Sequence, residues 1–157
     1  MKVEFKQLNS QAKIWIYTSK SKINEDQKAK ITSLSDEFLF DWQSHDKPVA
    51  GYIQVIEDYF IMIAADDQGE TLCGRAVDAN VRLIKQIQEV TGLNLMDRMV
   101  VIYKHKGQLF TSDYNSIKKD LKLGKIDTET IVYNPMVSTI KEFNNSFEQC
   151  IENSWIA

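Results

Sequence analysis

Hydrophobic and polar positions follow two different periods along the chain, and the change of period separates strands from helices. Residues 59–65, YFIMIAA, are apolar without interruption and rich in β-branched and aromatic side chains. Seven such residues are too few for a typical helix and fit a strand buried on both faces. From Val77 to Val90 apolar residues recur at spacings of three and four, which predicts an amphipathic helix stopped by Gly92.

The same two patterns recur on either side of this strand–helix pair. Residues 25–42 carry a helical stripe, and Asn24 with Gln27 makes a variant capping box before it. The remaining apolar runs predict strands at residues 13–18, 49–56, 99–103 and 108–111. The order strand, helix, strand, strand, helix, strand predicts an α+β fold of the ferredoxin-like βαββαβ type. Its antiparallel four-stranded sheet carries both helices on one face.

We expect a single domain over residues 1–157, with a βαββαβ core at 13–111 and a C-terminal extension at 112–157. The extension is predicted to hold a helix capped by Asp113, a short strand, and a helix capped by Ser138 that keeps its spacing to Ile151. A sheet with both helices on one face leaves the other face bare. We expect the extension or a second copy of the chain to cover it.

Composition narrows the classes of partner. A chain of 157 residues can bury about 68–70% of its unfolded surface, so it needs no metal or disulfide to fold. The net charge of −3 gives no general attraction to nucleic acid or to an anionic membrane. No apolar run reaches the length of a membrane span, and the N-terminal residues lack a signal-peptide core. Cys73 and Cys150 lie far apart without metal-binding spacing, so we expect a reducing, cytoplasmic setting without metal or cofactor.

The loop between the buried strand and its helix has the spacing of a phosphate-binding loop, from Gly69 to Gly74. Arg75 and Ala76 stand where such a loop needs Lys and Ser or Thr, which argues against ATP hydrolysis. One interpretation is an ordinary connection with two glycines. The other is an anion site, in which main-chain amides at the helix start act beside Gly74, Arg75 and Asp78.

Seven short runs along most of the chain carry a resemblance to a known family. They are IWIY at 14–17, WQSH at 42–45, FIMIA at 60–64, DANVRLI at 78–84, DR at 97–98, TIVYN at 130–134 and SW at 154–155. With these runs the chain resembles a family of small bacterial proteins commonly labelled "ABC transporter ATPase", whose members lack a Walker motif. The resemblance implies no mechanism.

The chain departs from that family at the start of the second helix. Relatives look like Gly-Cys-Ser-Ile-Asp, whereas this chain has Gly74-Arg-Ala-Val-Asp78. Arg75 therefore takes the position of the family's cysteine, and Cys73 lies two residues earlier. A thiol mechanism shared with the family is not expected here.

Cys73 is nevertheless the one candidate nucleophile, because the dipole at a helix N-terminus favours a thiolate. The ordinary interpretation is a small apolar loop residue. A Cys73–His45 pair is geometrically feasible, although nothing in the sequence demands it. His105 is expected at a hairpin tip. The adjacent carboxylates of Asp66 and Asp67 are candidates for binding a metal, but such pairs more often only solvate a turn.

No complete catalytic set emerges, so the leading hypothesis is a non-catalytic module that acts through a protein partner or as a homodimer. The alternative is a protein or enzyme that binds a small anionic ligand, such as a phosphate or a nucleotide, at Gly74, Arg75 and Asp78. Cys73 and His45 are further candidate ligand-binding residues.

Overall fold

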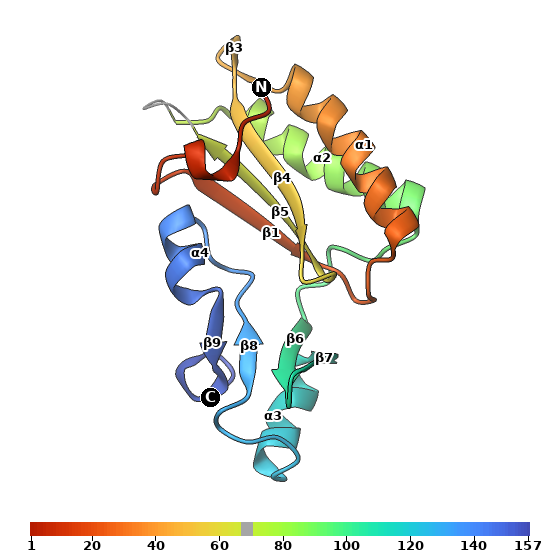
Figure 1. Ribbon diagram of the computed structural model, residues 1–157, viewed down its shortest axis with the longest axis vertical. Helices are drawn as coiled ribbons and strands as arrows, with labels where there is room; N and C mark the ends of the chain where they lie inside the picture. The colour runs from red at the N-terminus through yellow and green to blue at the C-terminus, as the bar shows by residue number, and fades with distance from the viewer. Residues whose placement is uncertain (67–70) are drawn as a thin grey trace.

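The computed structural model describes residues 1–66 and 71–157, and its first sheet has three antiparallel strands. Their order is β1 (Lys13–Thr18), β5 (Phe60–Asp66), β4 (Ala50–Ile56). Two helices, α1 (Glu25–Asp41) and α2 (Gly74–Thr91), lie together on one face of this sheet (Figure 1). The predicted α+β class and the placement of both helices on one face are confirmed.

The helix boundaries follow from local side-chain chemistry. The Asn24 side chain accepts from the Gln27 amide at 2.8 Å, and the Gln27 side chain accepts from the Asn24 amide at 3.0 Å. The predicted capping box is therefore confirmed. Gly92 closes α2 in the left-handed conformation, with φ of 75°, as predicted. The helix begins at Gly74, three residues before Val77, where the apolar stripe that predicted the helix starts.

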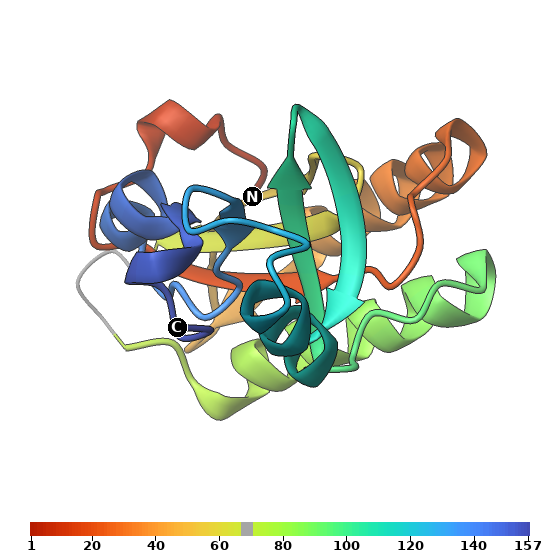
Figure 2. The same cartoon turned by 90° about the horizontal axis from the view of Figure 1, so that it is seen from below.

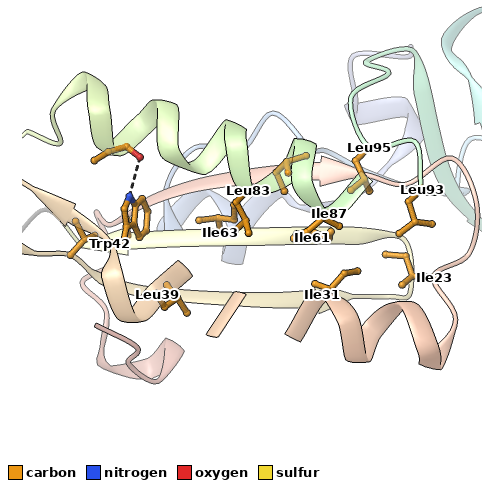
Figure 3. Packing of buried hydrophobic residues seen from close by; sticks show 14 residues of the cluster. Ile23, Ile31, Leu39, Trp42, Ile61, Ile63, Leu83, Ile87, Leu93 and Leu95 are labelled. Atoms are coloured by element: carbon orange, nitrogen blue, oxygen red, sulfur yellow. Dashed lines mark hydrogen bonds between the residues drawn. The ribbon is translucent and has the colours of Figure 1, made fainter. Parts of the chain in front are cut away.

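The main core lies between these two helices and the sheet (Figure 3). Trp42, which follows α1, is 3% exposed, and its indole Nε1 donates to the Ala76 carbonyl in the first turn of α2 at 3.0 Å. β4 packs closely against Leu39 of α1 and against Trp42 because Gly51 has no side chain. A Cβ there would lie 2.7 Å from Leu39 Cδ2 and 3.1 Å from the Trp42 ring.

The connection between β4 and β5 is one residue longer than the two-residue hairpin that the sequence predicts, because Ile56 lies opposite Phe60 and residues 57–59 lie between the strands. Glu57 and Asp58 have φ of 55° and 59°, the left-handed pair that a type I′ turn needs. Asp adopts this conformation more readily than most residues, whereas Glu is not favoured in it. Asp58 also accepts from Lys28 at 2.5 Å, which ties the turn to α1.

A second sheet lies against the other face of the first. Its order is β7 (Gln108–Asp113), β6 (Val100–His105), β8 (Ile131–Tyr133), β9 (Glu148–Cys150). The strands β6 and β7 run across those of the first sheet (Figure 2). The ferredoxin-like four-stranded sheet is not confirmed, because β6 pairs with β7 and β8, and no ladder joins it to β1 within the described residues.

The face of the first sheet without α1 and α2 is covered by the C-terminal part of the chain, as expected. Ile140 and Phe143 of α4 (Ile140–Ser146) pack over Ile14, Met62 and their neighbours, with the short turn η1 (Phe5–Gln7) beside them. Phe60 lies between the sheets, with its ring centroid 5.6 Å from that of Tyr133 and 5.1 Å from that of Phe147. Aromatic packing therefore joins the two layers.

The extension itself differs from the prediction in two ways. Its expected start at residue 112 falls inside β7, and α3 (Tyr114–Lys122) follows directly, capped by Asp113 as predicted. The final helix is capped by Thr139 and not by Ser138, and it ends at Ser146. The expected helical continuation to Ile151 is wrong. Residues 148–150 form β9 instead, because they supply the second ladder for β8.

Candidate functional site

The start of α2 is held by a small hairpin, β2 (Gln43–Ser44) and β3 (Lys47–Pro48). His45 and Asp46 form its tip with φ of 52° and 62°. The Cys73 amide donates to Ser44 Oγ at 2.9 Å, and His45 Nε2 lies 2.9 Å from the Thr71 carbonyl oxygen. Because a carbonyl only accepts, Nε2 of His45 carries the proton in this contact.

Hydrogen-bond donors converge on the Cys73 thiol, which precedes α2. The main-chain N–H of His45 has the largest effect, followed by the Ser44 hydroxyl and the main-chain N–H of Ala76. Together they lower the pKa of Cys73 to about 7, against a smaller rise from burial. The thiol is partly exposed. The thiol therefore ionises more readily at neutral pH than an ordinary cysteine.

The structure brings Cys73 and His45 together, but through the main chain of His45. Its imidazole bonds to Thr71, and the residues that the structure describes contain no hydrogen bond between that ring and the thiol. The sequence raised a Cys73–His45 pair only as feasible. The two residues do lie close together, but their contact is made by the main chain of His45 and is not a thiol–imidazole pair.

Of the other predicted ligand-binding residues, Arg75 reaches the Cys73 thiol through its main-chain N–H alone. Gly74 is the first residue of α2, with open space around the position of a Cβ. Arg75 lines a groove of about 410 Å³ between α1 and α2, together with Arg82. Asp78 is exposed, and it is not among the residues that line this groove.

Two of the acidic and glycine positions that the sequence singled out, Asp67 and Gly69, lie outside the described residues. Asp66 ends β5, and its carboxylate accepts from the Asn9 amide at 3.4 Å. His105 is the last residue of β6, one position before the turn that it was expected to occupy. Over residues 1–66 and 71–157, no cluster of three His, Cys, Asp or Glu side chains is arranged to hold a metal.

A second candidate site, which the sequence did not indicate, is a cleft of about 560 Å³ along β1. We call it the β1 cleft. It is lined by the whole of β1, by residues 95–98 with Val100, and by residues 135–138. Its volume lies in the range of about 300–1,000 Å³ that is usual for specific ligand sites.

The wall formed by β1 is a sheet edge without a paired strand in the described residues, along which Ile16 is partly exposed and Ile14 and Thr18 are buried. Because β1 is the outermost strand, every second residue points its main-chain N–H and C=O away from β5. At one end the Ile14 amide donates outward to the Ser138 carbonyl at 3.0 Å, and at the other the Lys20 amide donates to the Asn94 carbonyl at 3.2 Å. Between them, the C=O of Ile14 and both main-chain groups of Ile16 and Thr18 have no hydrogen-bond partner in the described part of the chain.

Methionines and cations border this edge. Met96 and Met136 line the cleft and are 39% and 63% exposed. Lys13 and Arg98 also line it, and Arg98 lies close enough to Tyr17 for its guanidinium to oppose the rise in the pKa of that phenol, which comes chiefly from burial.

Beneath the cleft, the Tyr17 hydroxyl donates to Asn80 Oδ1 of α2 at 2.8 Å. Asn80 is fully buried, and its Nδ2 has no partner in the described structure. This pair fixes the Tyr17 ring, which forms part of the cleft wall.

No signal in the sequence pointed to this cleft. Residues 13–18 read as an ordinary strand, and the expected fourth strand of the ferredoxin-like sheet would have paired with their outer edge. The cleft exists because β6 pairs elsewhere.

Comparisons with protein-family models, with curated proteins and with solved structures found no match to this chain. The resemblance to small bacterial proteins labelled "ABC transporter ATPase" therefore stays a prediction.

Proposed function

We propose that this protein is a non-catalytic interaction module that binds a protein partner through the β1 cleft. The observation that carries the proposal is the open main-chain edge from Ile14 to Thr18. An unpaired sheet edge is a template for pairing with another chain, and proteins usually blunt or cover such edges. Here the edge faces a cleft with exposed methionines, which are flexible and polarisable side chains suited to varied partners.

The arrangement around Cys73 supports the non-catalytic part of the proposal. A cysteine nucleophile is usually served by an imidazole that takes its proton and later returns it. The His45 imidazole donates through Nε2 to the Thr71 carbonyl, and no hydrogen bond joins its ring to the thiol in the described residues, so no imidazole base is positioned on Cys73. The donors that lower the pKa of the thiol are chiefly main-chain groups and a hydroxyl, which stabilise a charge without shuttling protons.

We place the protein in the cytoplasm as part of the same proposal. Its two cysteines are both free and partly exposed, which suits a reducing compartment. None of the helices in the described residues has both the length and the apolarity that crossing a bilayer requires.

The proposal is tested with three immobilised proteins: wild type, Met136→Glu, and Leu123→Glu as the matched control. Both substituted side chains are exposed, at 63% and 59%, but only Met136 lines the cleft. Each protein is exposed to extract of the source cells, and bound proteins are quantified by mass spectrometry. We expect a partner that wild type and Leu123→Glu retain and Met136→Glu loses. Equal retention by all three would refute the role of the cleft.

A homodimer is the other assembly that the sequence allowed, and light scattering at micromolar concentration distinguishes it. A partner-binding module is expected to elute as a monomer on its own. A dimer that Met136→Glu dissociates would replace the partner protein with a second copy.

A second candidate function is the binding of a small anion at the start of α2. The specific observation is the set of donors around Cys73, since groups that stabilise a thiolate also suit a phosphate oxygen. Thermal shift with inorganic phosphate and nucleotides tests it. We expect a rise in Tm that Ser44→Ala reduces, and an unchanged Tm with every compound would remove this candidate.

A further inference from the structure

We infer that the β1 cleft takes a short extended peptide of a partner protein, bound as an added strand, with apolar side chains and one acidic side chain. This inference rests on the proposed function, since it specifies how the partner is recognised at the same cleft. Four features of the cleft carry it.

The first feature is the direction of the free main-chain groups. The N–H and C=O of Ile16 both point away from β5, which is the arrangement of a residue that exchanges two hydrogen bonds with the residue opposite it in an antiparallel ladder. Ile14 and Thr18 add further unpaired groups on the same side, although these residues are only 3% and 7% exposed, so Ile16 is the principal point of contact. An extended peptide satisfies this set with its own main chain, which is the basis of recognition by strand addition.

The second feature is the length of the open edge. The contacts of Ile14 with Ser138 and of Lys20 with Asn94 close the edge at both ends. Four steps of about 3.3 Å separate Ile14 from Thr18, so the free stretch is roughly 13 Å long. It fits about four or five residues of peptide, and a longer chain must turn out of the plane of the sheet at each end.

The third feature is the apolar border. In an added strand, successive side chains point to opposite sides, so alternate residues of the peptide face the cleft wall. Met96 and Met136 stand on the two segments that flank β1, and both present exposed apolar surface. Apolar side chains of the peptide would cover them, and methionine adapts its shape to different partners.

The fourth feature is charge. Lys13 and Arg98 line the cleft, and neither has an ion pair with any of the residues described. The single acidic residue of the lining, Asp97, accepts from the Met99 amide at 2.9 Å. The cleft therefore offers unpaired positive charge, and a carboxylate on the peptide suits Arg98 in particular.

Pairing of β1 with the β1 of a second copy does not suit this cleft. Its own β1 lies between the same two flanking segments, so neither recessed edge can reach the other. A flexible segment that projects from a different protein has no such obstruction.

The test uses a displayed library of random ten-residue peptides, selected on the wild-type protein. We expect selected peptides to combine apolar residues at alternate positions with an Asp or Glu. Met136→Glu should weaken their binding about tenfold or more, and Arg98→Gln about two- to fivefold, whereas Leu123→Glu should leave it unchanged. An unchanged Tm of each variant shows that its fold is intact.

The decisive measurement is a scan in which each peptide amide in turn is N-methylated, which removes one main-chain donor. Strand addition predicts losses of about tenfold or more at alternate positions only, with protection of the Ile16 amide from hydrogen exchange. Equal losses at all positions, no losses, or an unprotected Ile16 amide would overturn the inference.

This outcome is separable from failure of the proposed function. If no peptide is enriched but a cellular partner still depends on Met136, the partner uses a folded surface, and the strand inference alone fails. If neither peptide nor partner depends on Met136, both fail.

Discussion

The hydrogen bond between Tyr17 and Asn80 gives the sharpest test of the core beneath the cleft. Tyr17→Phe removes only the hydroxyl that donates to Asn80 Oδ1 at 2.8 Å. Asn80 is fully buried and its Nδ2 already lacks a partner in the described structure, so the variant leaves both polar atoms of the amide unpaired. We therefore expect a loss of about 1–3 kcal/mol in the free energy of unfolding. For a chain of this length that corresponds to a fall in Tm of about 2–12 °C.

A second substitution shows whether the loss of stability comes from the unpaired side-chain amide of Asn80. Asn80→Leu in the Tyr17→Phe background replaces the amide with an apolar side chain of similar size, so no buried polar atom remains unpaired. Replacing both partners of a buried hydrogen bond in this way is often close to neutral. We expect the double variant to recover most of the stability that Tyr17→Phe loses.

Urea unfolding of wild type, both single variants and the double variant, followed by tryptophan fluorescence, gives the coupling energy of the pair. Two results would refute the reasoning. One is a Tyr17→Phe protein within about 0.5 kcal/mol of wild type, since a stranded buried amide costs more than that. The other is a double variant in which the two losses simply add.

Three further predictions concern packing, the thiol and the β4–β5 turn. Gly51→Ala should lose about 1–3 kcal/mol of stability in urea unfolding, while Gly74→Ala, with open space around it, should lose none. With the other cysteine replaced by serine, alkylation of Cys73 should accelerate as the pH rises through about 7, and Ser44→Ala should move that midpoint upward. A wild-type midpoint near 9 would contradict the donor set. Glu57→Asn should raise Tm by a few degrees, because Asn adopts the left-handed conformation more readily; a lower Tm would contradict this.

Local features of this fold could be read from the sequence. The cap at Asn24, the stop at Gly92 and the tight turn at Glu57-Asp58 all depend on residues within a few positions of one another. Their chemistry is complete in a short window, which explains why the sequence predicts them. The contact between Cys73 and His45 was raised only as feasible, because it requires the small hairpin at residues 43–48 to fold back on α2.

Partner choice between strands could not be read in the same way. Residues 100–105 have the composition of a strand, but nothing in their periodicity says whether they pair with β1 or with β8. The spacing of Phe143, Phe147 and Ile151 fits a helix. Residues 148–150 nevertheless form a ladder with β8 and supply hydrogen-bond partners to the main chain at its edge. At residues 100–105 and at residues 148–150, hydrogen bonding between strands outweighs the local sequence pattern. The outer edge of β1 has no partner strand in the described part of the chain because β6 pairs with β8.

The division of the chain between its two layers has a consequence for folding during synthesis. The first sheet and its helices use only residues 13–91, whereas the second sheet uses residues 100–150. The earlier layer is therefore complete in sequence before the later one has left the ribosome, and Phe60 then has neither Tyr133 nor Phe147 to cover it. The half-made protein exposes an aromatic face, which is the surface that chaperones bind and on which nascent chains aggregate. Closure of the later layer is the step that removes this hazard.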